Sequence, residues 1–222
     1  SKESPGRRRC RLWMCGAFTV ADILAPPSAD LNNKEYVLVD GVYHTCFYIT
    51  GYGYPSSVGG GWLNPIVESG EGINVSFTVH RQAREKILPK ISNTTMFNRS
   101  RMRDIGDTRQ DYEEMDSAID AGLYLKNEMN RNGEDFYYMS TLMEVYADDL
   151  DTLEQRAAGL ETRCTALNMV ARRCDYRNEK GFLSALPLLQ LAPDLECKSR
   201  RSALTSGVAS AFPFSSFEIC DQ

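Results

Sequence analysis

Hydrophobic and polar residues alternate most clearly in the segment 73–80. Its apolar members are Ile73, Val75, Phe77 and Val79. Such alternation places one face of a strand against a core and the other towards solvent. Two earlier segments, 36–40 and 43–50, are rich in β-branched and aromatic residues and are joined by Asp40-Gly41, a pair typical of tight hairpin turns. The pattern therefore predicts an antiparallel hairpin followed by a half-buried strand.

Helical spacing of apolar residues dominates much of the remaining chain. A short helix is expected over 63–68, and two helices are expected between residues 84 and 130, with a break at Gly106 and Asp107. A third, longer helix is predicted over 150–171. Its apolar stripe, at intervals of three and four residues, consists of Leu150, Leu153, Ala157, Leu160, Cys164, Leu167 and Val170.

The segment 135–147 is apolar on both faces, which predicts a strand in the centre of a sheet. Residues 174–177 are predicted to form a short strand, residues 183–191 to begin as helix or extended chain before Pro187, and residues 199–212 to form a final helix. This order of elements predicts an α+β fold. Its expected form is a ferredoxin-like split β-α-β sheet with a helical insertion and additional C-terminal helices.

Composition places the chain among ordinary globular proteins. With 222 residues it is long enough for one large domain, or for one domain and an appendage. A net charge of -5 argues against a protein that coats nucleic acid through its overall field. Seven cysteines without a CxxC pair favour reduced thiols in a cytosolic protein. Residues 1–18 are expected to form a disordered arm.

The glycine-rich stretch GYGYPSSVGGGW (51–62) has the position of a phosphate-binding loop, between a predicted strand and a predicted helix. The dinucleotide fingerprint needs a third glycine where Ser56 stands, and no GxxxxGK[ST] motif occurs in the chain. We therefore interpret the stretch as a flexible connection whose glycines adopt positive φ.

Other candidate sites lack the full set of groups that their chemistry needs. His44 and Cys46 share one face of a strand and His80 ends another, but no fourth metal ligand stands at a recognisable spacing. The acidic residues of 107–120 are typical of the solvated face of a helix. We expect no catalytic residue, metal site or cofactor in this chain.

The segment 81–103 is locally basic. The candidate partner-binding patch consists of Arg81, Arg84, Lys86, Lys90, Arg99, Arg101 and Arg103. An extended backbone would direct the last three side chains to one side, whereas a helix would spread them. Such a patch suits phosphate, anionic lipid or an acidic partner. The alternative is a solvated face that pairs with Asp104, Asp107 and Asp111.

Several segments together resemble a known family over most of the chain, from Thr19 to Gln222. The most specific are TVADILAP (19–26), the connection from GYGYP to GWL (51–63) and AFPFSS (211–216). They resemble the N-terminal domain of the CagE/TrbE/VirB family of type IV secretion (conjugal transfer) ATPases, in the form carried by Gram-positive conjugative elements.

The resemblance implies that residues 19–222 are a docking and assembly domain. Its implied partners are inner-membrane components of a secretion channel and other copies of the ATPase, at the cytoplasmic face of the cell membrane. Family members hold their Walker motifs, and with them ATP and magnesium, in a RecA-like domain beyond this region, so no catalytic position is carried over. The alternative, less favoured, is a nucleic-acid-binding module that uses the basic patch and sheet aromatics such as Phe136 and Tyr138.

Overall fold

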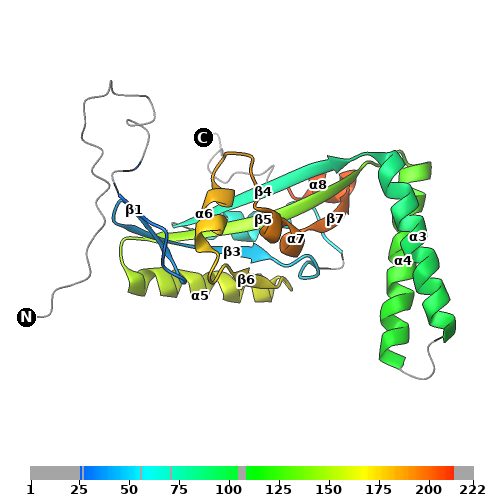
Figure 1. Ribbon diagram of the computed structural model, residues 1–222, viewed down its shortest axis with the longest axis horizontal. Coiled ribbons are helices and arrows are strands. Elements are labelled where there is room, and N and C mark those ends of the chain that lie inside the picture. The colour runs from blue at the N-terminus through cyan, green and yellow to red at the C-terminus, as the bar shows by residue number, and fades with distance from the viewer. Residues whose placement is uncertain (1–25, 27, 56, 71, 105–108, 213–222) are drawn as a thin grey trace, which may run out of the picture.

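An antiparallel sheet forms the centre of the protein in the computed structural model (Figure 1). The structure describes residues 26, 28–55, 57–70, 72–104 and 109–212. The strands are β1 (Ala29–Asp30), β2 (Val37–Val39), β3 (Val42–Ile49), β4 (Ile73–Gln82), β5 (Phe136–Ala147), β6 (Ala171–Arg173) and β7 (Arg201–Leu204). The helices are α2 (Asn64–Val67), α3 (Arg84–Asp104), α4 (Arg109–Arg131), α5 (Leu150–Ala166), α6 (Asn178–Ala185), α7 (Pro193–Ser199) and α8 (Thr205–Ser210). The α+β class predicted from the sequence is confirmed.

The neighbouring strands follow the order β1-β2-β3-β5-β4, with β6 beside β3 and β7 beside β5. The predicted hairpin joins β2 to β3, and Val39 lies opposite Val42. Asp40 and Gly41 both have positive φ, 52° and 88°. This is the backbone that a two-residue turn needs to match the twist of its strands.

β5 lies in the middle of the sheet, as its two apolar faces predicted. It pairs with β4 along one edge. Along the other edge its first residues pair with β7 and its later residues pair with β3. Met143 and Val145 face one core cluster, whereas Leu142 faces another. A strand covered on both faces needs apolar residues at consecutive positions, which explains the pattern.

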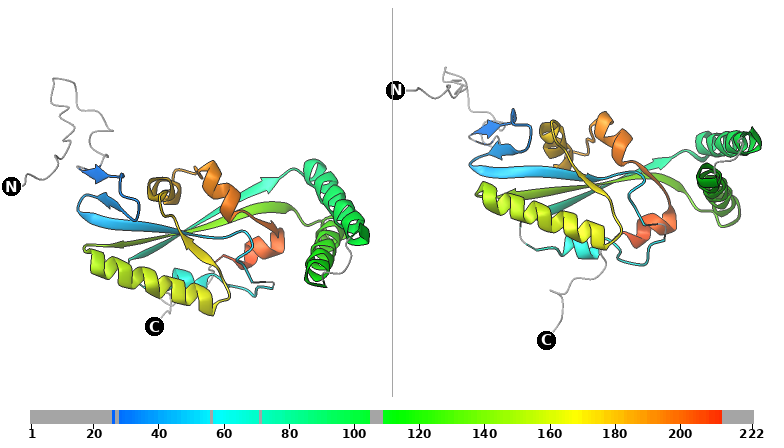
Figure 2. Two further views of the ribbon diagram at one scale, coloured as in Figure 1. Left: turned by 60° about the horizontal axis from the view of Figure 1, so that its bottom comes forward. Right: turned by 90° about the horizontal axis from the view of Figure 1, so that it is seen from below.

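Helices cover both faces of the sheet, with α2, α5 and α8 on one side and α6 and α7 on the other (Figure 2). The buried positions of α5 are Leu153, Ala157, Leu160 and Cys164, all within the predicted stripe. Asp149 caps this helix by accepting a hydrogen bond from the backbone N–H of Thr152 at 2.8 Å. α5 ends at Ala166, earlier than predicted, because Asn168 adopts the left-handed conformation with φ 55°.

Two predictions for the C-terminal third are wrong. The strand expected at 174–177 is β6 (Ala171–Arg173), because the early end of α5 lets the chain meet β3 sooner. The helix expected over 199–212 is interrupted by β7, which pairs with the first residues of β5. No β-branched residue marks Arg201–Leu204, so this strand depends on the open edge of β5 rather than on its own propensity.

The predicted helical pair is confirmed as α3 and α4, which project together from one end of the sheet and are called the helical arm below (Figure 1). The predicted break at Gly106 and Asp107 lies outside the described residues. Ile87 and Met129 bury the base of the arm against Phe136 of β5 and Leu204 of β7. The arm therefore replaces the turn between β4 and β5 and is anchored by a small core of its own.

Candidate functional site

The basic residues of 81–103 lie at the junction of β4 with α3 and along α3 itself. Two of them hold the arm in place. Arg81 forms an ion pair with Asp135 at 2.8 Å, and Arg84 donates hydrogen bonds to the backbone carbonyl of Met129 and, at 3.2 Å, to Oδ1 of Asn130. Arg84 ties the beginning of α3 to the end of α4, and Arg81 ties the end of β4 to the residue before β5, so both contribute to structure.

Four members of the predicted patch are exposed on α3: Lys86, Lys90, Arg99 and Arg101. A helix advances about 100° per residue, which places Lys86, Lys90 and Arg101 within an arc of about 60°. Arg99 lies about 160° from Arg101 around the same helix. The patch expected from the sequence is therefore divided, because a helix spreads alternate residues. Arg103 belongs to α3, but its side chain lies outside the described part of the chain.

An exposed aromatic side chain joins the three aligned cations. Phe97 lies within the same arc and is 61% exposed. The guanidinium carbon of Arg101 lies 5.8 Å from the centroid of the Phe97 ring, within cation–π range. We refer to Lys86, Lys90, Phe97 and Arg101 as the α3 stripe. It combines three positive charges with apolar area on a helix that projects from the sheet.

The glycine-rich connection serves to bring backbone segments together. The N–H of Gly51 donates to the carbonyl of Lys198 at 2.9 Å, and the N–H of Gly61 donates to the carbonyl of Ser210 at 2.7 Å. A Cβ on Gly51 would lie 2.5 Å from the Arg200 carbonyl oxygen, and one on Gly53 would lie 2.4 Å from Oγ1 of Thr50.

Close approach, rather than positive φ, is therefore what requires glycine at positions 51 and 53, and only Gly61 among the glycines of this stretch has positive φ. The amide groups of Gly51 and Gly61, which a phosphate site would need, already donate to carbonyl oxygens. The stretch is a connection, as expected, but the prediction that its glycines adopt positive φ is wrong except at Gly61, and the connection is packed at its beginning.

His44 belongs to a hydrogen-bonded group on the sheet that sequence reasoning missed. Its Nδ1 lies 2.8 Å from Oε1 of Glu144, and Nδ2 of Asn74 donates to Oε2 of Glu144 at 3.0 Å. Burial raises the pKa of Glu144, but the bonds from His44 and Asn74 outweigh this, so the pKa lies below its ordinary value. The carboxylate therefore stays ionised within the sheet and links β3, β5 and β4.

The remaining histidine lies far from this group. His80 is opposite Tyr138, whereas His44 is opposite Tyr146, eight residues further along β5. At about 3.3 Å per residue the two histidines are about 26 Å apart along the strand. Within the described ranges, no three acidic, histidine or cysteine side chains gather in a way that would hold a metal ion.

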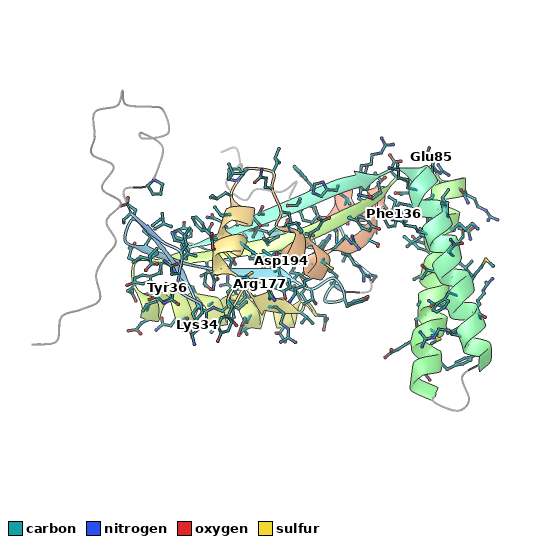
Figure 3. The ribbon with its side chains drawn as sticks, viewed as in Figure 1. Lys34, Tyr36, Glu85, Phe136, Arg177 and Asp194 are labelled. Carbon is teal, nitrogen blue, oxygen red and sulfur yellow. The ribbon has the colours of Figure 1, made fainter. Side chains whose placement is uncertain are left out.

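The aromatic pair that would serve a nucleic-acid module is used in packing. Figure 3 shows Phe136 where the arm leaves the sheet, and only 3% of this residue is exposed. Tyr138 packs edge-on against Phe136, and the guanidinium carbon of Arg200 lies 4.4 Å from its ring centroid. Stacking on bases needs open ring faces. These two rings do not offer them.

A surface depression near the start of the sheet is a further feature that the sequence did not indicate. Its lining consists of Lys34, Glu35, Arg173, Asp175 and Tyr176. Arg173 is already engaged there, donating to Glu154 at 2.7 Å and to Oγ1 of Thr45 at 2.8 Å. Arg173, in the wall of the depression, therefore has a structural role, because it connects β6 with α5 and β3.

The acidic residues predicted to be a solvated helical face lie on α4. Glu113, Glu114, Asp116 and Asp120 are exposed along it. The arm thus has one largely basic and one largely acidic helix. No helix among the described residues is both long and apolar enough to cross a membrane.

Comparison with known proteins adds no assignment: the chain matches no protein-family model and no curated protein.

Proposed function

We propose that this chain is the non-catalytic N-terminal domain of a conjugal-transfer type IV secretion ATPase, which docks the motor onto inner-membrane channel components and neighbouring subunits. The observation that carries the proposal is the α3 stripe. It presents Lys86, Lys90 and Arg101 beside the exposed ring of Phe97 on a projecting helix. Charge on the rim of a contact steers association, and an aromatic anchor supplies buried area.

The order of strands supports the finer description of the fold. β3, α2, β4, β5, α5 and β6 follow one another along the chain, and the strands among them lie in the order β6-β3-β5-β4. Two interleaved β-α-β units give this order, so we propose a ferredoxin-like split β-α-β sheet. The helical arm then occupies the place of its central hairpin turn. Sheet and arm together suit a domain that positions a motor.

The length of the arm suits docking at a distance from the sheet. α3 has 21 residues, which corresponds to about 32 Å at 1.5 Å per residue. Its tip can therefore reach a partner without bringing the sheet against it. ATP and magnesium would be bound by the motor domain that is expected in the parent protein. The contribution of the residues described here would be to bind partner proteins.

Charge reversal on the arm tests the proposal. The triple variant Lys86→Glu, Lys90→Glu, Arg101→Glu reverses the α3 stripe. The matched control, Arg99→Glu, Lys126→Glu, Arg131→Glu, makes the same change of net charge at exposed positions of the arm outside the stripe. Each protein is sedimented with inner-membrane vesicles from cells that make the channel components and from cells that lack them.

The wild type and the control are expected to sediment only with vesicles that hold the channel components, and the stripe variant is expected to remain in solution. Equal sedimentation of the stripe variant and the wild type would remove the stripe from the proposal. Sedimentation of the wild type with both kinds of vesicle would indicate a lipid surface instead of a protein partner.

A further inference from the structure

One long edge of the sheet is open within the described part of the protein. β4 pairs with β5 over Ile73–Gln82, and no other described strand pairs with it. The opposite side of the sheet ends in much shorter strands, of two residues in β1 and three in β6. An open edge presents a row of backbone N–H and C=O groups that can pair with another strand.

The open edge of β4 lacks the features that usually prevent such pairing. Between Ile73 and Val79 there is no charged residue and no proline. Natural edge strands commonly carry lysine, proline or a bulge, or are very short. β4 has ten residues, and its apolar side chains at 73, 75, 77 and 79 are only partly buried against the core. The strand is therefore suited to a partner strand.

The sequence of β4 is complementary to itself, and this identifies the partner. We propose that a second copy of this chain adds its own β4 to the sheet, antiparallel, with Ser76 opposite Ser76. In this register Val75 lies opposite Phe77 and Ile73 opposite Val79, so apolar residues meet on one face. Asn74 lies opposite Thr78 on the other face, and no charges of like sign meet. Apolar and polar cross-strand pairs of this kind stabilise sheets.

The arrangement of the arm is compatible with this contact. α3 begins at Arg84, beyond Val79, the last residue of the paired stretch. Because the two strands run in opposite directions, the two arms lie at opposite ends of the joined sheet and outside the contact. The result is one continuous sheet with an isologous interface, in which the same residues serve both copies.

This inference gives a structural form to the contact between neighbouring subunits, and to that extent it rests on the proposed function. Its evidence is nevertheless confined to β4, whereas docking to channel components depends on the α3 stripe. The two are tested by different measurements, self-association and vesicle sedimentation, so that one can fail without the other.

The test uses charges placed on the two-fold axis. In Ser76→Lys, and equally in Ser76→Glu, two like charges would face each other across the interface, whereas a mixture of the two variants would place Lys opposite Glu. Ser57→Lys and Ser57→Glu are the matched controls, at an exposed position outside the sheet. Self-association is measured by sedimentation equilibrium over a series of concentrations, and circular dichroism checks that each variant is folded.

The wild type and both controls are expected to form dimers. Each Ser76 variant alone is expected to dimerise at least about tenfold more weakly, because two like charges would face each other across the interface. The equimolar mixture of Ser76→Lys and Ser76→Glu is expected to recover the affinity. A monomeric wild type, a dimer insensitive to charge at position 76, or a mixture without recovery would each overturn the inference.

Discussion

Oδ1 of Asn178 accepts a hydrogen bond from the backbone N–H of Cys46 at 3.2 Å. Cys46 lies in the middle of β3, on the edge of that strand that pairs with β2 and β6. β2 pairs with β3 up to His44, and β6 pairs with it from Phe47 onwards, so a gap separates the two partner strands. The Asn178 amide fills this gap, and its Nδ2 donates to the carbonyl of Lys34 at 2.9 Å. A side chain thus takes the place of a strand where the ladder changes partner.

Asn178→Ala is expected to lower the free energy of unfolding by about 1–3 kcal/mol, because the N–H of Cys46 would lose its partner in a buried place. Asn178→Asp keeps an acceptor for Cys46, but it loses the donor to Lys34 and places a carboxylate in a buried position, so it is also expected to be less stable than the wild type. Urea denaturation of the three proteins measures the effect. If Asn178→Ala were as stable as the wild type, the bridging role would be refuted.

Glycine substitutions test the packed part of the glycine-rich connection. Gly53→Ala is expected to cost about 1–3 kcal/mol, as overpacking of a filled site does, since its Cβ would also lie 2.7 Å from Cβ of Val170. Gly59→Ala is the matched control, because a Cβ there meets nothing within 4 Å. Thermal denaturation should separate the two variants, and equal midpoints would contradict the close approach.

The group around Glu144 predicts acid sensitivity. The folded-state pKa of Glu144 lies below the ordinary value, so at mildly acidic pH the unfolded chain binds more protons at this position than the folded chain does. The contribution of Glu144 is therefore fully present above the ordinary glutamate pKa and is lost as the pH falls through the folded-state pKa.

Glu144→Gln should reduce stability at neutral pH by about 1–3 kcal/mol, as expected for loss of hydrogen bonds to a buried charge. The difference from the wild type should shrink as the pH falls below the ordinary glutamate pKa of about 4.3. Urea denaturation at a series of pH values follows both proteins. A difference that stays constant across the series would assign the effect to packing alone.

The cysteines should differ in reactivity. Burial raises the pKa of the Cys174 thiol to about 12 and that of Cys164 to about 11, and it also raises the pKa of Cys46. Cys197 is exposed. Because the thiolate is the reactive form, iodoacetamide should modify Cys197 in the folded protein and the other three only after unfolding. Peptide mass spectrometry locates the label, and early modification of Cys174 would contradict the burial.

The glycine-rich connection also predicts that this chain does not bind ATP through residues 51–62. Its amides at Gly51 and Gly61 are occupied, and no lysine follows its glycines. Calorimetric titration with Mg-ATP should give no heat of binding at millimolar nucleotide. A saturable signal that Gly60→Asp abolishes would show that the loop is a nucleotide site after all.

Patterns that depend on neighbouring residues predicted most of the fold correctly. The alternation in β4, the turn at Asp40 and Gly41 and the stripe of α5 are each determined within one short segment. β7 was not predictable in this way, because Arg201–Leu204 becomes a strand only beside an edge of β5 that is distant in the chain. The end of α5 could have been found from Asn168, a residue that tolerates left-handed backbone.

The candidate site was predictable in composition but not in arrangement. The sequence showed which residues of 81–103 are basic, yet their grouping required knowing that the segment is helical. The roles of Arg81 and Arg84 depend on Asp135 and Asn130, which approach only when β4 and β5 pair. The pairing of His44 with Glu144 likewise depends on the register of β3 against β5, which no local pattern specifies.

Gln82 and Phe136 lie opposite each other at the last pair of β4 and β5, immediately before the chain departs into the arm and just after it returns. The sheet is thus already complete where the arm begins. Beyond the contacts of Ile87 and Met129, insertions or deletions of matched helical turns would leave the rest of the domain undisturbed. Mutations can therefore change the length and the surface of the arm without changing the sheet. Proteins with the same sheet can in this way come to bind different partners through the arm.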